Sequence, residues 1–220
     1  MDRVVILGAS RGLGAELVKY ICSQVRLPVM GFGRKEAALK ALQDKYPLFE
    51  YRVADFSTHT GQDETLRHLI EQNYSHVFSV AGGGPYGLFH ERKMKDHDWA
   101  WEVTFRFPAR VVHALRVAGK EQKLILTGSS VAESGPDPMA ASYSAAKHAL
   151  KGLFSSVRAE NPGWDIRLFS PGYMDTELLP PNAAVRQHGV YSPSQLAREL
   201  WAWTLTADET GLRVYPIHPT

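Results

Sequence analysis

The chain has 220 residues, 44% of them hydrophobic and 22% charged, with a formal net charge of +2. This length suits a single domain over residues 1–220 that buries about 70% of its unfolded surface. The small charge of mixed sign excludes the basic stripe of a nucleic-acid-binding protein, and no apolar run is long enough to cross a membrane.

Short β-rich runs alternate with helical patterns along the chain, which is typical of a parallel sheet covered by helices on both faces. The predicted strands are residues 4–7, 28–32, 49–53, 76–80, 123–127, 166–170 and 212–216. The predicted helices are residues 13–25, 35–45, 63–73, 96–119, 140–160 and 194–205. Residues 177–191, which include two consecutive prolines, are the predicted mobile loop beside a substrate.

The N-terminus, the single cysteine and the histidines indicate the cellular location and the absence of thiol or metal chemistry. Met1-Asp2-Arg3 leads into the first strand without the apolar core of a secretory signal, so we expect a cytoplasmic protein. Cys22 is the only cysteine, and its helical pattern predicts a buried small side chain rather than a nucleophile. The nine histidines lack the spacing of metal ligands, so we expect no metal site.

A glycine-rich turn follows the first strand and reads Gly8-Ala9-Ser10-Arg11-Gly12-Leu13-Gly14. A tight strand-to-helix turn needs residues without a β-carbon where a ligand approaches the backbone. The following helix offers free N–H groups and the positive end of its dipole to phosphate. The spacing G-x-x-x-G-x-G differs from the G-x-G-x-x-G fingerprint, but its place after the first strand favours a dinucleotide site over an ordinary turn.

Two arginines bear on which dinucleotide binds. The second strand ends without the acidic residue that usually binds the ribose of NAD, and Arg34 stands there instead. Arg34 and Arg11 can contact the 2′-phosphate of NADP, so we expect NADP; two solvated arginines are the alternative. Asp55, after the third strand, either accepts from the adenine amino group or caps a helix.

Tyr143 and Lys147 lie four residues apart and therefore share a helix face. A tyrosine normally loses its proton near pH 10, and a neighbouring ammonium lowers that pKa toward neutrality. Ser130 follows the fifth strand, and the carboxyl ends of parallel strands face the ligand crevice. These three residues form the candidate catalytic set, in which the Ser130 hydroxyl holds a carbonyl oxygen beside the tyrosine.

With these motifs, the sequence resembles the short-chain dehydrogenase/reductase family over nearly its whole length. The resemblance rests on the glycine loop, Asp55, Ala81-Gly82, the candidate catalytic set and the segment from Pro171 to Thr176. It implies a doubly wound, Rossmann-like α/β fold with a seven-stranded parallel sheet in the order 3-2-1-4-5-6-7. It also implies that Tyr143 is the acid, that Lys147 tunes it and binds the nicotinamide ribose, and that Thr176 holds the carboxamide. The expected cofactor residues are Gly8, Ser10, Arg11, Gly12, Leu13, Gly14, Arg34, Asp55, Phe56, Ala81, Gly82, Tyr143, Lys147, Pro171, Gly172, Tyr173 and Thr176.

The chain departs from the family pattern at three places. Leu7 replaces a threonine, and Ser79-Val80 replaces an asparagine pair. Arg106 stands where the family has an asparagine that supports a water relay from the lysine. Three outcomes are open for Arg106: it depresses the pKa of the tyrosine further, it blocks the relay, or it swings out to solvent or a partner subunit.

These observations predict an NADPH-dependent reductase of a ketone or aldehyde, and a catalytically weak NADP-binding sensor or scaffold is the alternative. The resemblance also implies a homodimer or homotetramer, paired through long helices. The aromatic residues of the 96–119 helix belong either to that interface or to the core. They are Trp99, Trp101, Phe105 and Phe107. We expect no nucleic-acid or membrane partner.

Overall fold

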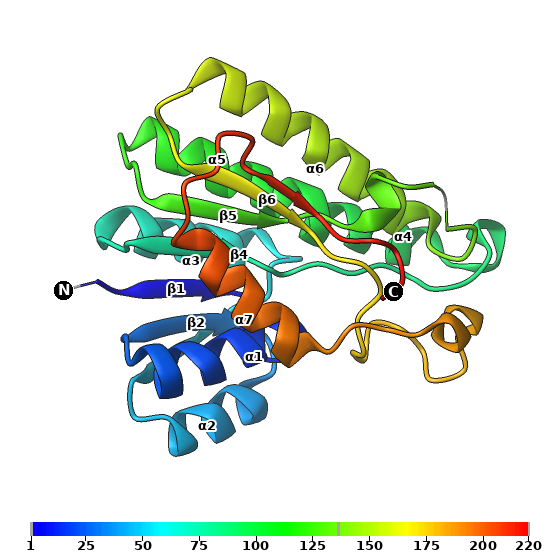
Figure 1. Cartoon of the computed structure of the whole chain (residues 1–220), viewed down its shortest axis with the longest axis horizontal. Coiled ribbons are helices and arrows are strands. Elements are labelled where there is room, and N and C mark those ends of the chain that lie inside the picture. The colour runs from blue at the N-terminus through cyan, green and yellow to red at the C-terminus, as the bar shows by residue number, and fades with distance from the viewer. Residues whose placement is uncertain (1, 136, 220) are drawn as a thin grey trace.

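In a computed structural model, which describes residues 2–135 and 137–219, the predicted strands form one parallel sheet (Figure 1). The strands are β1 (Val4–Leu7), β2 (Val29–Gly33), β3 (Phe49–Val53), β4 (His76–Ser79), β5 (Lys123–Thr127), β6 (Ile166–Ser170) and β7 (Leu212–Val214). Their order is β3-β2-β1-β4-β5-β6-β7, and every neighbouring pair is parallel. The structure therefore confirms the predicted fold class and strand order.

Helices cover both faces of this sheet (Figure 1). The α-helices are α1 (Gly12–Tyr20), α2 (Glu36–Lys45), α3 (His59–Glu71), α4 (Met94–Trp101), α5 (Phe107–Val117), α6 (Ala141–Glu160) and α7 (Pro193–Thr204). The short helices are η1 (Ile21–Val25), η2 (Phe89–Glu91), η3 (Glu102–Arg106), η4 (Ser130–Ala132) and η5 (Ala184–His188). In the described part of the chain, no helix has both the length and the apolar character needed to span a bilayer.

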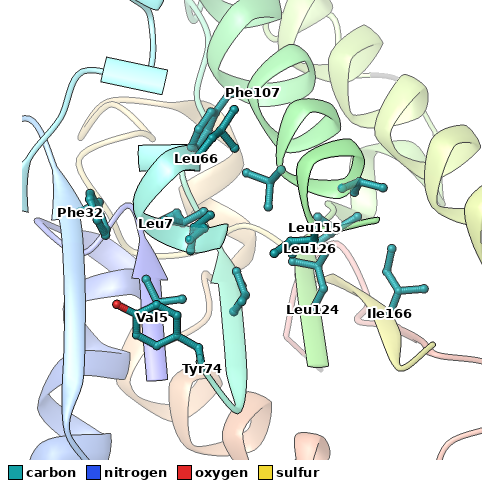
Figure 2. Close-up of a cluster of buried hydrophobic side chains, with 14 of the residues drawn as sticks. Val5, Leu7, Phe32, Leu66, Tyr74, Phe107, Leu115, Leu124, Leu126 and Ile166 are labelled. Atoms are coloured by element: carbon teal, nitrogen blue, oxygen red, sulfur yellow. The ribbon is translucent and has the colours of Figure 1, made fainter. Parts of the chain in front are cut away.

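The alternation of side chains along β1 divides the core into two halves. Val5 and Leu7 point to one face and pack with residues of α3, α5 and α6, as Figure 2 shows for part of this cluster. Val4 and Ile6 point to the other face and pack with residues of α1, α2 and α7. All four side chains are fully buried, as expected for the central strand of a doubly wound sheet. Cys22 lies in the second half, and burial raises the pKa of its thiol to about 12, which confirms an inert packing role.

The predicted helix over residues 96–119 is in fact two α-helices joined by a π-helical turn. The turn, η3, contains an extra residue per turn and so rotates the side chains that follow it. Within this turn Thr104 points into the protein, fully buried, whereas Arg106 is exposed and lies 3.7 Å from Glu102. The aromatic residues are also divided, since Phe107 is in the core and Trp101 is 44% exposed.

The loops that follow β1, β4, β5 and β6 meet at the carboxyl edge of the sheet, where the candidate functional residues lie. The predicted loop over residues 177–191 contains η5 and folds around one arginine. Arg186 bonds to the Asp175 carboxylate at 2.7 Å, to the Leu179 carbonyl at 2.8 Å and to the Pro180 carbonyl at 2.9 Å. These bonds hold the loop beside the cleft at the sheet edge.

Candidate active site

A long cleft crosses the carboxyl edge of the sheet, with about 940 Å³ of empty space that is partly open to solvent. The glycine loop forms its floor. Gly8 and Gly12 adopt positive φ angles of 107° and 53°, which side-chain-bearing residues rarely adopt. A β-carbon at Gly14 would lie 2.1 Å from the Gly8 carbonyl oxygen, so only glycine permits this close packing of helix against strand.

The N-terminus of α1 opens into the cleft. Arg11 precedes this helix in an extended conformation, and its side chain makes no capping bond. The first N–H groups of α1 are consequently free to bind an anion, and the helix dipole favours negative charge at this end. The cleft and the helix end together fit the pyrophosphate of a dinucleotide.

Arg11 and Arg34 line the cleft, and Lys35 contacts Glu177, another residue of its lining. Arg11 and Lys35 both bind the Glu177 carboxylate, at 3.1 Å and 3.0 Å. These two cations hold the pKa of Glu177 below its usual value. Arg34 lines the same cleft, with its guanidinium 5.2 Å from the centre of the Trp99 ring. Two cations that share one exposed carboxylate can exchange it for a phosphate, because the contact is solvent-accessible and weak.

Asp55 lines the cleft and does not cap a helix. Its Oδ1 atom accepts from the Ser57 backbone at 2.9 Å and from the Ser57 hydroxyl at 2.7 Å. The cap of α3 is Thr58, which accepts from the Gly61 N–H at 3.1 Å. Asp55 therefore lines the cleft and does not cap α3, and its contact with the adenine amino group stays a prediction.

Most of the residues expected to bind the cofactor line this cleft. They are Gly8, Ser10, Arg11, Gly12, Leu13, Gly14, Arg34, Asp55, Phe56, Ala81, Gly82, Tyr143, Lys147 and Thr176. Pro171, Gly172 and Tyr173 do not line it. The Pro171 carbonyl instead accepts from the Ser130 N–H at 2.8 Å, and Gly172 packs against the chain near Pro216.

Several lining residues were not expected from the sequence. They are Gly33, Ala54, Val80, Trp99, Val103, Thr127, Met174, Glu177 and Leu178. Most carry no chemical group that marks a site, so only the fold reveals them. Met174 and Glu177 flank the expected Thr176 and could have been found from their place in the loop after β6.

Tyr143 and Lys147 lie one turn apart on α6, as predicted, with the Lys147 ammonium 5.3 Å from the centre of the tyrosine ring. Lys147 is only 2% exposed and donates a hydrogen bond to the Thr127 carbonyl at 2.6 Å. Burial lowers the pKa of Lys147 to about 7. Burial also raises the pKa of Tyr143 to about 12, although the nearby Ser129 hydroxyl opposes this shift.

The pKa of Tyr143 is therefore raised in this structure and not lowered as expected. Desolvation of the phenolate is the main cause, and burial likewise favours the neutral form of Lys147. Tyr143 consequently keeps its proton at neutral pH. A protonated phenol facing a cleft can donate its proton to a developing oxyanion.

The serine that lines a second hollow beside Tyr143 is Ser129, whereas Ser130, expected from the sequence to be catalytic, does not line it, so the catalytic role of Ser130 stays a prediction. The Ser129 hydroxyl oxygen accepts from the Val131 N–H at 3.4 Å, and Ser129 and Tyr143 both belong to the wall of this hollow. Ser130 begins the short helix η4, and its hydroxyl oxygen is buried without a hydrogen-bond partner among the described residues. The turn into η4 sends the two adjacent side chains in different directions, which spacing alone could not reveal.

The helix residue beside the lysine is Thr104, and not Arg106. The Thr104 hydroxyl both accepts from the Gly83 N–H and donates to the Gly83 carbonyl, each at 2.8 Å. A β-carbon at Gly82 would lie 3.3 Å from the Lys147 nitrogen and 3.6 Å from the Thr104 hydroxyl oxygen. Arg106 swings out to solvent, so of its three open outcomes the structure selects the one that leaves the lysine undisturbed.

Comparison with known proteins agrees with this geometry. A family model described as short chain dehydrogenase matches residues 2–186. The chain belongs to the short-chain dehydrogenase family. It is 29% identical over 207 residues to an uncharacterized oxidoreductase of Schizosaccharomyces pombe, covering 90% of this chain and 70% of that protein.

Two further similar proteins have names that state a bound ligand. The chain is 27% identical over 188 residues to the cyclic-di-GMP-binding biofilm dispersal mediator protein of Escherichia coli K12, covering 83% of this chain and 77% of that one. The crystal structure of BdcA in complex with NADPH superposes with a TM-score of 0.81 at 22% identity, covering 96% of this chain and 91% of that one. At this identity the structural likeness shows a shared short-chain dehydrogenase fold.

Proposed function

We propose that this protein is an NADPH-dependent oxidoreductase that reduces the carbonyl of a small ketone or aldehyde. The observation that carries this proposal is the position of Tyr143, which lines both the cofactor cleft and the adjacent hollow. Met174, Thr176 and Leu178 also line both, so the two spaces meet beside the tyrosine. A substrate in the hollow would lie between the phenol and a nicotinamide in the cleft.

The residues of the cleft fit NADP. Arg11, Lys35 and Arg34 supply positive charge for a 2′-phosphate, and the second strand offers no carboxylate to repel it. When bound, NADPH supplies the hydride for the carbonyl carbon. The buried ammonium of Lys147, which faces the same cleft, is placed to hold ribose hydroxyls as the family resemblance implies.

A side chain of the protein supplies the proton that the carbonyl oxygen of the substrate receives. Tyr143 donates its phenolic proton to the carbonyl oxygen, and the Ser129 hydroxyl holds that oxygen beside it. Lys147 stabilises the resulting phenolate from one helical turn away, 5.3 Å from the ring centre. A phenol that is protonated at neutral pH favours this direction over alcohol oxidation.

Three variants, compared with the wild type, test the proposal. NADPH consumption with a panel of activated ketones is expected for the wild type, and Tyr143→Phe should lower kcat by about 10²- to 10⁴-fold. Ser129→Ala should lower kcat by about a hundredfold, and Ser130→Ala is its matched control, expected to keep most activity. Turnover that survives Tyr143→Phe, or that is lost in Ser130→Ala alone, would contradict the assignment.

A second candidate is a catalytically weak sensor or scaffold that binds NADP. It draws support from the similarity to the cyclic-di-GMP-binding dispersal mediator. The reactive placement of Tyr143 and Lys147, which a pure sensor does not need, weighs against it. Tight NADPH binding by calorimetry, with no turnover on a broad ketone panel, would favour the sensor.

The chain is further proposed to pair with copies of itself through the helix that carries Trp101. The Trp101 ring packs 4.6 Å from the Phe105 ring on a surface-exposed face, whereas Phe107 belongs to the core. Analytical ultracentrifugation should give a dimer or tetramer, and Trp101→Glu should shift it toward monomer.

A further inference from the structure

The hollow next to Tyr143 contains a buried acid that the proposed chemistry does not use. The hollow has about 570 Å³ of empty space, partly open to solvent, and Tyr143 and Ser129 form the wall shared with the reaction site. Asp137 lines the same hollow and is only 6% exposed. A carboxylate at this depth is rare unless a partner balances its charge.

The partners of Asp137 are hydrogen-bond donors without charge. Its Oδ1 atom accepts from the Met139 N–H at 2.8 Å, and its Oδ2 atom accepts from the Tyr173 hydroxyl at 2.5 Å. Among the described residues, no lysine, arginine or histidine nitrogen lies within 4.0 Å of this carboxylate. The negative charge is therefore solvated by two dipoles and left unneutralised by the protein.

The charge of Asp137 raises the pKa of two tyrosines that line the hollow. Burial raises the pKa of Tyr173, and the hydrogen bond and charge of Asp137 raise it further. Burial also raises the pKa of Tyr86, with Asp137 as the second cause. Both rings line the hollow, and aromatic faces attract cations.

A cation in the hollow would relieve the cost of the buried carboxylate, whereas an anion would add to it. We propose that the substrate of this protein is a carbonyl compound that carries a positively charged nitrogen, an ammonium or guanidinium group, which binds beside Asp137. This inference rests on the proposed carbonyl reduction and names its substrate class. It excludes carboxylated and phosphorylated carbonyl compounds as good substrates.

Three para-substituted acetophenones of similar size test the inference. They carry an aminomethyl group (cationic), an ethyl group (neutral) or a carboxylate (anionic). With NADPH and the wild type, we expect kcat/KM for the cationic ketone to exceed that for the neutral one by at least about tenfold, with the anionic ketone lowest. Asp137→Asn keeps an oxygen acceptor for the Met139 N–H, removes the charge and replaces the oxygen that accepts from Tyr173 by an NH2 group, so it should abolish the preference for the cation. Glu160→Gln removes an exposed charge at the end of α6 and should leave that preference intact.

Binding of the same ketones to the NADPH complex, measured by calorimetry, separates this inference from the proposed function. Turnover without a charge preference, or with a preference that Asp137→Asn retains, overturns the inference and leaves carbonyl reduction standing. Charge-selective binding that Asp137→Asn abolishes, without turnover of any ketone, supports a cation site beside Asp137 but overturns both the proposed reaction and the substrate class inferred from it. If Asp137→Asn fails to fold, the wild type decides alone, because equal binding of the cationic and neutral ketones contradicts the inference.

Discussion

The buried Lys147 beside Tyr143 should make the free energy of unfolding depend on pH, and the substitution Lys147→Met should remove this dependence. Lys147 has a pKa of about 7 in the folded protein against an ordinary value of 10.5, because burial disfavours its ammonium. Between these two pH values the unfolded chain binds more protons at this residue than the folded chain does. The free energy of unfolding therefore rises with pH across this window, and the destabilising effect of the ammonium is complete below pH 7.

Lys147→Met keeps a flexible side chain of similar length and removes the titrating group. The free energy of unfolding of the wild type, minus that of Lys147→Met, should rise by about 1.4 kcal/mol per pH unit between pH 7.5 and 9.5. At pH 7.5 the variant should be the more stable protein. Other groups, such as the buried Cys22 thiol, titrate in both proteins and cancel in the difference.

Urea unfolding followed by circular dichroism at pH 7.5, 8.5 and 9.5 measures this difference directly. Over the two units the expected change is about 3 kcal/mol, well above the error of extrapolation. A difference that stays constant with pH would refute the reasoning, because it would mean that Lys147 remains charged in the folded protein.

Two further changes test other parts of the site. Thr104→Val leaves the buried N–H and carbonyl of Gly83 without their partner, so it should cost about 3 kcal/mol and lower Tm by about 6–12 °C in a calorimetric scan. Thr104→Ser keeps the hydroxyl and should lose far less; equal losses would contradict the role of the two bonds. Glu177→Gln frees Arg11 and Lys35 and should tighten NADPH binding about two- to fivefold at low salt, with little effect on NADH, as measured by calorimetry. Weaker NADPH binding would show that Glu177 helps to hold the cofactor.

The sequence was sufficient to predict those parts of the fold that depend on local pattern. Runs of buried, mostly apolar residues place β1 and β5 at their observed bounds, because strands buried on both faces must be apolar along most of their length. The glycine loop was equally clear, since close backbone contacts, such as that of Gly14 with Gly8, tolerate no side chain. Tyr143 and Lys147 were placed together by helical periodicity alone.

Errors arose where the local backbone decides what a side chain faces. Thr104 and Arg106 lie two residues apart in the π-helical turn η3, and nothing in the composition marks which of them lies near the lysine. The backbone turn at the start of η4 likewise selects Ser129 over its neighbour. Asp137 was not predicted from the sequence, because its site forms only when Tyr173, from the loop after β6, packs against it.

Hydride transfer to a carbonyl carbon is the central claim, and isotope transfer tests it most directly. The purified protein would be incubated with a reducible ketone and NADPH that carries deuterium at the pro-R or pro-S position of the nicotinamide C4. We predict that one of the two labelled forms, and only one, delivers deuterium to the carbinol carbon of the alcohol, as detected by mass spectrometry, and that Tyr143→Phe gives almost no alcohol. Absence of labelled alcohol from both forms, under conditions in which NADPH binds, would contradict the account.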